Sequence, residues 1–195
     1  MFNNFYKYLL ALIIFIILCF LGLIFSLNSL GSLDFLENIF SDTGAISSFG
    51  FAWPTPNYNT ITSYYGYRKA PTSGAGTFHG GIDIGAPTGS VVVSAFPGRV
   101  TYIGFYGANG YTVRVSDGYY TANYSHVSPY FLVYVGQFVN TGDIIATVGP
   151  KNVYGVPNNP YKDLSGNPTN GATTGPHLHF SIKIDGQAVN PLNYF

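Results

Sequence analysis

Residues 111–126 read YTVRVSDGYYTANYSH, and this stretch decides the fold class. It contains two runs, Tyr111–Ser116 and Tyr119–His126, that are rich in β-branched and aromatic residues, the types enriched in strands. Asp117-Gly118 joins the runs, and two-residue type I′ turns prefer this dipeptide because both positions need a positive φ. The stretch therefore predicts a β-hairpin closed by a type I′ turn.

Short strand-like runs separated by turn residues continue on both sides of this hairpin. After Trp53-Pro54, no stretch carries apolar residues at helical spacing over three turns. Asp185-Gly186 repeats the turn dipeptide, and Thr141-Gly142 separates Gln137–Val139 from the next run. The pattern predicts a mainly β domain, built as an antiparallel sheet or sandwich. The other predicted strands are Val91–Ala95, Arg99–Phe105, Asp143–Val148 and Leu178–Ile184.

Composition narrows the classes of partner and of metal site. A chain of 195 residues has room for one domain and an extension. Only 8% of the residues are charged, against about 25% in typical domains, and Lys+Arg 8 balances Asp+Glu 8. Such a surface has no basic patch for phosphate backbones, so nucleic acid is not expected as a partner. Cys19 is the single cysteine, which excludes an internal disulfide and leaves His and carboxylates as metal ligands.

An apolar segment near the N-terminus predicts a membrane anchor. Tyr8–Leu27 reads YLLALIIFIILCFLGLIFSL, a run of about 20 uncharged residues that matches the thickness of a bilayer as a helix. The apolar part of a cleavable signal peptide is shorter, about 7–15 residues, and ends at a small-residue cleavage site. We therefore favour an uncleaved transmembrane helix over a cleaved signal.

Charges beside the apolar segment predict its orientation. Lys7 precedes the segment, and acidic residues follow it, so the positive-inside tendency places the C-terminal bulk outside the cytoplasm. The expected organisation is a single-pass protein of the cell membrane with an extracytoplasmic domain. Its parts are a cytoplasmic N-terminus at residues 1–7, a transmembrane helix at residues 8–27, a juxtamembrane linker at residues 28–48 and the β domain at residues 49–195.

Residues 150–176 interrupt the pattern of strands. The segment is dense in Asn, Pro and Gly and predicts a long loop. Structureless loops beyond about 12–15 residues are uncommon in compact domains, and they are usually functional or disordered. Because the segment runs directly into His177, we expect it to form one wall of a substrate groove; a mobile surface insertion is the alternative.

Histidines at three places are the candidate functional residues. In His79-Gly80-Gly81-Ile82-Asp83 a short strand would bury Ile82 and turn Asp83 to the opposite face, although this motif taken alone favours a structural, hydrogen-bonded His–Asp pair. In His177-Leu178-His179-Phe180 a period of two sends both imidazoles to one face, which suggests a metal or a reaction. The fourth histidine, His126, ends the second strand of the hairpin.

Four motifs occur in the order HGGID (79–83), YSHVS (124–128), GDIIATVG (142–149) and TGPHLHF (174–180), and together they resemble the LytM/lysostaphin-type M23 zinc metallopeptidase domain. The resemblance covers about Trp53 to Phe195 and implies the mainly β fold of that family. It also implies that Zn²⁺ is bound by His79, Asp83 and His179, and that His126 and His177 are catalytic groups that do not bind the metal. The segment at residues 150–176 departs from the family because it is longer than the usual turn.

The chemistry of these residue types agrees with the implied roles. Two imidazoles and one carboxylate leave a tetrahedral Zn²⁺ with one open position, as in catalytic sites. The resemblance therefore implies a membrane-anchored endopeptidase that cleaves cross-links or stem peptides of peptidoglycan. The alternative is a non-catalytic scaffold or wall-binding domain that acts with a cell-envelope protein partner. An enzyme is favoured because all five site residues are present.

Overall fold

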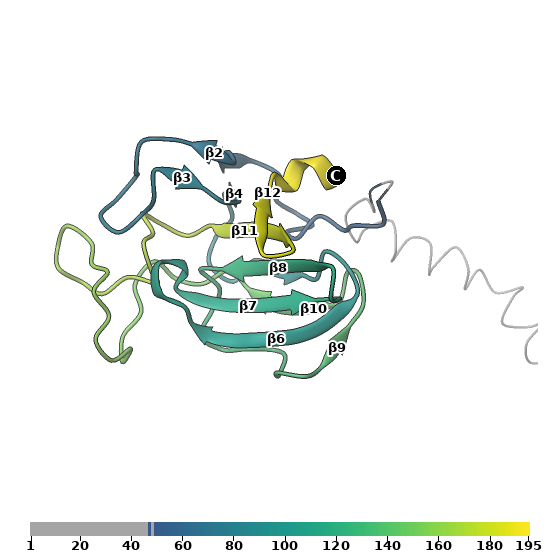
Figure 1. The fold of residues 1–195 in the computed structure, drawn as a ribbon. Coiled ribbons are helices and arrows are strands. Elements are labelled where there is room, and N and C mark those ends of the chain that lie inside the picture. Colours follow the sequence, from purple (N-terminus) through teal and green to yellow (C-terminus); the bar gives the residue numbers. More distant parts are fainter. Residues whose placement is uncertain (1–46, 48) are drawn as a thin grey trace, which may run out of the picture. The chain divides into compact units, whose positions relative to one another are not determined.

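An eight-stranded antiparallel sheet is the largest element of the structure, a computed structural model that describes residue 47 and residues 49–195 (Figure 1). Seven strands follow one another across it, and an eighth, β12, pairs with β11. In spatial order they are β1 (Ile61–Ser63), β4 (Ile82–Ile84), β11 (Leu178–Ile184), β8 (Tyr120–Ser125), β7 (Tyr111–Ser116), β6 (Gly98–Phe105) and β9 (Phe138–Val139), with β12 at Gln187–Val189. The prediction of a mainly β, antiparallel domain is confirmed.

Two smaller sheets and two short helices complete the described region. The pairs are β5 (Val91–Val93) with β10 (Ile144–Thr147), and β2 (Gly66–Tyr67) with β3 (Phe78–His79). The helices are the 3-10 turns η1 (Gly107–Asn109) and η2 (Pro191–Tyr194). Among the described residues no helix is long and apolar enough to cross a membrane. The predicted anchor at residues 8–27 lies outside them, as do residues 1–7 and nearly all of the linker.

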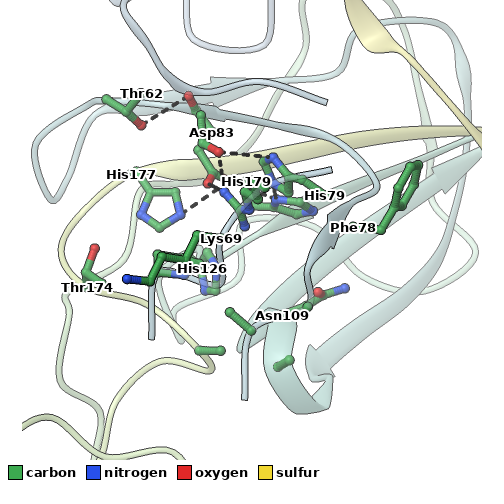
Figure 2. Close-up of a pocket in the computed structure, with 17 residues that line it drawn as sticks. Thr62, Lys69, Phe78, His79, Asp83, Asn109, His126, Thr174, His177 and His179 are labelled. Atoms are coloured by element: carbon green, nitrogen blue, oxygen red, sulfur yellow. Dashed lines mark hydrogen bonds and ion pairs between the residues drawn. The ribbon is translucent and has the colours of Figure 1, made fainter. Parts of the chain in front are cut away.

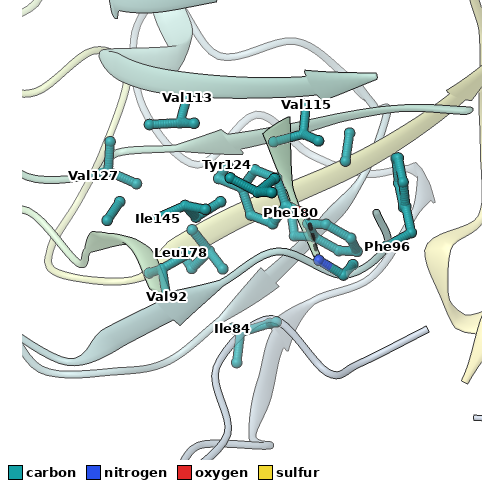
Figure 3. Packing of buried hydrophobic residues seen from close by; sticks show 14 of the residues in the cluster. Ile84, Val92, Phe96, Val113, Val115, Tyr124, Val127, Ile145, Leu178 and Phe180 are labelled. Carbon is teal, nitrogen blue, oxygen red and sulfur yellow. Dashed lines mark hydrogen bonds between the residues drawn. The ribbon is translucent and has the colours of Figure 1, made fainter. Parts of the chain in front are cut away.

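The hydrophobic core lies between the large sheet and the β5–β10 pair (Figure 3). Val113, Tyr124 and Phe180, on three neighbouring strands, are fully buried on one face of the sheet. Val92 and Ile145 of the smaller pair pack against them. Each such side chain contributes about 1.5–3 kcal/mol when it leaves water. Because side chains alternate along a strand, burying this face leaves the intervening polar residues together on the other one.

The hairpin β7–β8 is confirmed, but its turn is not of type I′. Gly118 has a positive φ and Asp117 does not. The Asp117 carboxylate instead accepts hydrogen bonds from the backbone N–H groups of Tyr119 and Tyr120, at 2.8 and 2.6 Å. These side-chain hydrogen bonds of Asp117 stabilise a connection between β7 and β8 that is longer than a two-residue type I′ turn. A two-residue turn with two positive φ values occurs at Asp185-Gly186, between β11 and β12.

Residues 150–176 form an ordered excursion rather than a structureless loop. Asn152 pairs with Thr169 in an antiparallel bridge, so the chain leaves the domain and returns at neighbouring positions. Farther out, the Asp163 carboxylate accepts hydrogen bonds from the backbone N–H groups of Ser165 and Asn167. Asn and Asp side chains thus replace the backbone partners that a sheet would supply. Figure 1 shows the segment extending beyond the ends of the sheet strands.

Candidate metal and catalytic centre

Three side chains converge on the polar face of the large sheet. Asp83 in the middle of β4 pairs in register with His179 on β11, and His79 ends the neighbouring strand β3. Asp83 Oδ1 lies 2.9 Å from His179 Nδ1 and 3.1 Å from His79 Nε2, and these two nitrogens are 2.9 Å apart (Figure 2). One ligand atom from each residue lies within 4.8 Å of the others. The sequence-predicted ligands are therefore brought together.

The local sequence explains why the two motifs can lie so close. Ile82 and Ile84 are buried in the core, as predicted, which turns Asp83 to the opposite face. A Cβ atom on Gly81 would lie 2.3 Å from the Phe180 carbonyl oxygen, so only glycine permits this approach of the chain to β11. Gly81 of HGGID therefore allows the strand containing His179 to approach the Asp83 strand.

The three residues fit a metal such as zinc in number, type and orientation. His79 Nδ1 donates a hydrogen bond to the Tyr64 carbonyl oxygen at 2.9 Å, which leaves Nε2 unprotonated and facing the other two ligands. Two neutral imidazoles and one carboxylate are the donors of open, catalytic zinc sites. Burial lowers the pKa of His179, although its contact with Asp83 opposes this shift. The neutral imidazole required for metal binding is thus favoured.

Arg68 holds the outer oxygen of the Asp83 carboxylate. Its Nη1 atom lies 3.0 Å from Asp83 Oδ2 and also contacts the Ser63 hydroxyl. Burial alone would raise the pKa of Asp83, but its contacts with the imidazoles of His179 and His79 hold it well below its usual range. Asp83 is therefore an anion with one oxygen fixed by Arg68 and the other directed at the imidazoles. The sequence analysis did not identify Arg68, because no local pattern links it to a strand fifteen residues farther on.

His126 and His177 lie beside the three ligand residues. Their ring centroids are 4.7 Å apart, and the His126 ring is 6.2 Å from that of His179. In each residue Nδ1 donates to a backbone carbonyl, at 2.7 Å to Asn170 for His126 and at 2.9 Å to Gly175 for His177. Both Nε2 atoms are consequently left as acceptors. Burial, reinforced by the nearby His177 and His179, keeps the pKa of His126 well below its usual value, so it is neutral at pH 7.

The backbone at His126 is unusual for a residue with a side chain. Its φ is +59°, in the left-handed region, directly after β8 ends at Ser125. Its N–H donates to the Asn109 carbonyl and its carbonyl accepts from Gly149 N–H, so both backbone groups are satisfied. Residues in this region are retained where the surrounding contacts determine them, and they are concentrated at functional sites.

All five residues line one open cleft of about 460 Å³. One wall comes from the chain between β2 and β3, and another from η1 and from the end of the long segment (Figure 2). The further lining residues are Thr62, Ser63, Arg68, Lys69, Pro71, Ala75, Gly76, Phe78, Ala108, Asn109, Ala172 and Thr174. Of residues 150–176, only Ala172 and Thr174 belong to the lining, so the predicted wall is formed by the end of this segment alone.

Comparison with known proteins identifies the family of this site. The sequence profile of peptidase family M23 matches residues 77–161. The DD-carboxypeptidase/endopeptidase Mpg of Neisseria meningitidis is 33% identical over 138 residues, which are 70% of this chain and 27% of that protein. The murein hydrolase activator NlpD of Salmonella typhimurium is 29% identical, over 73% of this chain and 31% of that protein. The chain thus spans less than a third of the length of these curated relatives.

A solved structure agrees with the sequence relatives. The zinc-containing peptidase from Vibrio cholerae has 27% identity and a TM-score of 0.56, and it is matched over 75% of this chain and 39% of its own. The profile match includes HGGID and YSHVS, which supply three of the five site residues, and the structural match spans most of the described domain. This chain therefore contains a domain of peptidase family M23.

Proposed function

We propose that the domain is a zinc-dependent endopeptidase that cleaves peptide bonds in the cross-links or stem peptides of peptidoglycan. The observation that carries the proposal is the convergence of His79, Asp83 and His179, with two further histidines in the same cleft. Support for the substrate comes from a further relative, ShyB of Vibrio cholerae, whose name describes a peptidoglycan DD-endopeptidase. We also propose that residues 8–27 anchor the protein in the cell membrane, with the domain on the extracytoplasmic side.

The proposed reaction assigns separate tasks to the ligands and to the second histidine pair. His79, Asp83 and His179 would hold Zn²⁺, which when bound acidifies water and polarises a peptide carbonyl. His126 and His177 present Nε2 atoms into the cleft, and these can accept a proton or, when protonated, hydrogen-bond a developing oxyanion. Asn170 and Gly175 hold the opposite ring nitrogens, so neither ring needs to rotate before it acts.

A non-catalytic scaffold is the competing function. NlpD, one of the relatives, is named a murein hydrolase activator rather than a hydrolase. A scaffold has no need for two histidines whose Nε2 atoms are directed into a cleft beside three ligand residues. Zinc content and loss of turbidity of purified cell walls distinguish the two functions. A zinc-loaded protein that clears the walls is an enzyme, and one that leaves them intact is a scaffold.

Asn170 is expected to be a positioning residue for His126. It is fully buried, and its backbone carbonyl accepts the His126 Nδ1 hydrogen bond. Its side-chain oxygen accepts from Tyr111 N–H at 2.7 Å, and its side-chain nitrogen donates to the Val127 carbonyl at 3.0 Å. The side chain thus ties the end of the long segment to Tyr111, at the start of β7, and to Val127, which directly follows His126.

Asn170→Ala should lower the rate of hydrolysis while zinc remains bound. The change leaves two buried backbone groups unpaired, at about 1–3 kcal/mol each, and frees the carbonyl that fixes the His126 tautomer. We expect ¹⁵N NMR to show a mixture of His126 tautomers in place of the single Nδ1–H form. Asn159→Ala is the matched control, because Asn159 also bonds backbone groups within the segment but does not touch His126. Equal effects of the two variants would contradict the assignment.

The outer part of the long segment is expected to control access to the cleft. A Cβ atom on Gly74, in the β2–β3 connection, would lie 2.6 Å from Tyr161 Cε1, so the Tyr161 ring packs directly against the opposite cleft wall. Replacing residues 153–168 by a short Gly/Ser turn removes this contact but keeps Asn152 and Thr169, whose pairing closes the excursion. Shortening such a loop has a small entropic effect.

We expect this shortened variant to bind zinc and to cleave intact cell walls faster relative to small stem peptides. The reason is that the bulky peptidoglycan polymer gains most access to the cleft when Tyr161 no longer joins its two sides. The measurement is the ratio of the two rates in the variant and in the wild type. An unchanged ratio would show that residues 153–168 are a surface insertion without a role in substrate choice.

A further inference from the structure

A second polar cluster lies on the same sheet face, one row of residues away from the metal ligands. In the first row His179 pairs with Ser125, and Ser125 pairs with Thr112. The second row lies two residues away on each strand. In it Ser181 pairs with Asn123, Asn123 with Arg114, and Arg114 with Tyr102. Side chains two residues apart on a strand point to the same face. Arg114 therefore shares the face of His179, across two strand spacings.

The Arg114 guanidinium is fixed on three sides. Its Nε donates to Asn123 Oδ1 at 2.7 Å, and Asn123 is itself buried and donates to the Ser181 hydroxyl at 3.1 Å. The guanidinium carbon lies 5.5 Å from the centre of the Tyr102 ring and 5.0 Å from that of Tyr106. These contacts, each a cation–π interaction, hold the side chain in one orientation.

The outer edge of this guanidinium is open. Neither Nη atom makes a hydrogen bond or an ion pair with any residue of the described region, residue 47 and residues 49–195. The two other arginines differ, because Arg68 is bound to Asp83 and Arg99 donates Nη1 to the Gly136 carbonyl. A guanidinium fixed at Nε with two free amino groups presents a planar fork, the geometry that matches a carboxylate. Arg114 is itself only partly buried, and the neighbouring Tyr106 is 48% exposed, so the fork lies at the surface of the domain.

We propose that Arg114, together with Tyr102 and Tyr106, binds a carboxylate of the peptide substrate, and this proposal rests on the peptidase function proposed above. Strands lie about 4.8 Å apart and rise about 3.4 Å per residue, which places Arg114 about 12 Å from His179 along the sheet face. An extended peptide covers about 3.3–3.6 Å per residue. The carboxylate therefore lies three or four residues from the bond that is cleaved, and it comes from an acidic side chain or from the peptide's C-terminus.

Kinetics with matched peptides test the proposal in the full-length chain. Three stem peptides are compared: one with both carboxylates free, one with the acidic side chain amidated and one with the C-terminus amidated. Arg114→Gln should raise KM for the peptide with both carboxylates by about tenfold or more, because a charge-assisted pair of hydrogen bonds is lost, and should leave kcat unchanged. The KM of Arg114→Lys for this peptide should lie between those of the wild type and Arg114→Gln, since lysine keeps the charge but not the planar fork. The amidation that removes the difference between wild type and Arg114→Gln identifies which carboxylate is bound.

Arg99→Gln is the matched control and should change no KM value. A purely structural role for Arg114 predicts equal losses on all three peptides together with a lower melting temperature, and that result would overturn the proposal. If the wild type cleaves no peptide, the proposed peptidase function is wrong. Calorimetric binding of the peptide with both carboxylates then tests whether Arg114 binds a carboxylate. Binding that Arg114→Gln weakens and Arg99→Gln does not would support the carboxylate site, and equal binding by all three proteins would refute it.

Discussion

Replacing any one of His79, Asp83 and His179 by alanine is expected to abolish stoichiometric zinc binding and, with it, hydrolysis. Each residue supplies one of the three ligand atoms that, among the residues the structure describes, lie within 4.8 Å of one another. A site reduced to two ligands cannot keep the geometry of a catalytic zinc site. The measurement is zinc content of the purified full-length variants by elemental analysis, with circular dichroism to verify the β fold.

Arg68 provides a graded test of the same assignment. It contacts Asp83 Oδ2 and would not touch the metal, so Arg68→Gln should weaken zinc binding by about 10–100-fold without eliminating it. Full zinc occupancy in the His79, Asp83 and His179 variants would refute the ligand assignment.

Zinc affinity should also fall in acid, because the imidazoles must be neutral to bind the metal and become protonated as the pH falls.

His126→Ala and His177→Ala should retain zinc and the fold but lose hydrolysis by about 10²–10⁴-fold, the usual contribution of general acid–base catalysis. Their Nδ1 atoms are occupied by the carbonyl oxygens of Asn170 and Gly175, which leaves only Nε2 to act in the cleft. Because they lie outside the set of three ligand atoms, the two variants also serve as metal-binding controls for the ligand variants. Single-turnover rates on a stem peptide, measured at equal zinc occupancy, give the size of the loss.

Two outcomes would change this assignment of roles. If either variant lost its zinc, that histidine would have to be a ligand, and one of the three proposed ligands would have to leave the set. If both variants hydrolysed the peptide at the wild-type rate, the second histidine pair would have no catalytic role.

The longer strands and the site residues could be predicted from sequence because their signals are local. The predicted bounds of Tyr111–Ser116 and Leu178–Ile184 agree with β7 and β11. In HLHF and HGGID the alternation of apolar and polar residues places His179 and Asp83 on the face opposite the core. The resemblance to a family implied only that His179 and Asp83 bind the same metal. That these two motifs pair in register across β4 and β11 is a tertiary fact that only the structure shows.

The features that sequence reasoning missed depend on contacts between distant residues. The strands β1, β2 and β3 have two or three residues each, too few for a period to be recognised. Arg68 acquires its role by reaching Asp83 on another strand, and Asn170 is one of several asparagines in a polar segment. The type I′ turn expected at Asp117-Gly118 failed because the Asp117 carboxylate caps the backbone itself.

Digestion of purified peptidoglycan of known cross-link chemistry, followed by mass spectrometry of the fragments, tests the central claim most directly. The zinc-loaded full-length protein is compared with the same protein after chelation and with His177→Ala. We predict new peptide ends in the cross-links or stem peptides with the zinc-loaded wild type alone, and their recovery when zinc is restored to the chelated protein. Intact peptidoglycan after exposure to fully zinc-loaded protein, or equal cleavage by His177→Ala, would contradict the account.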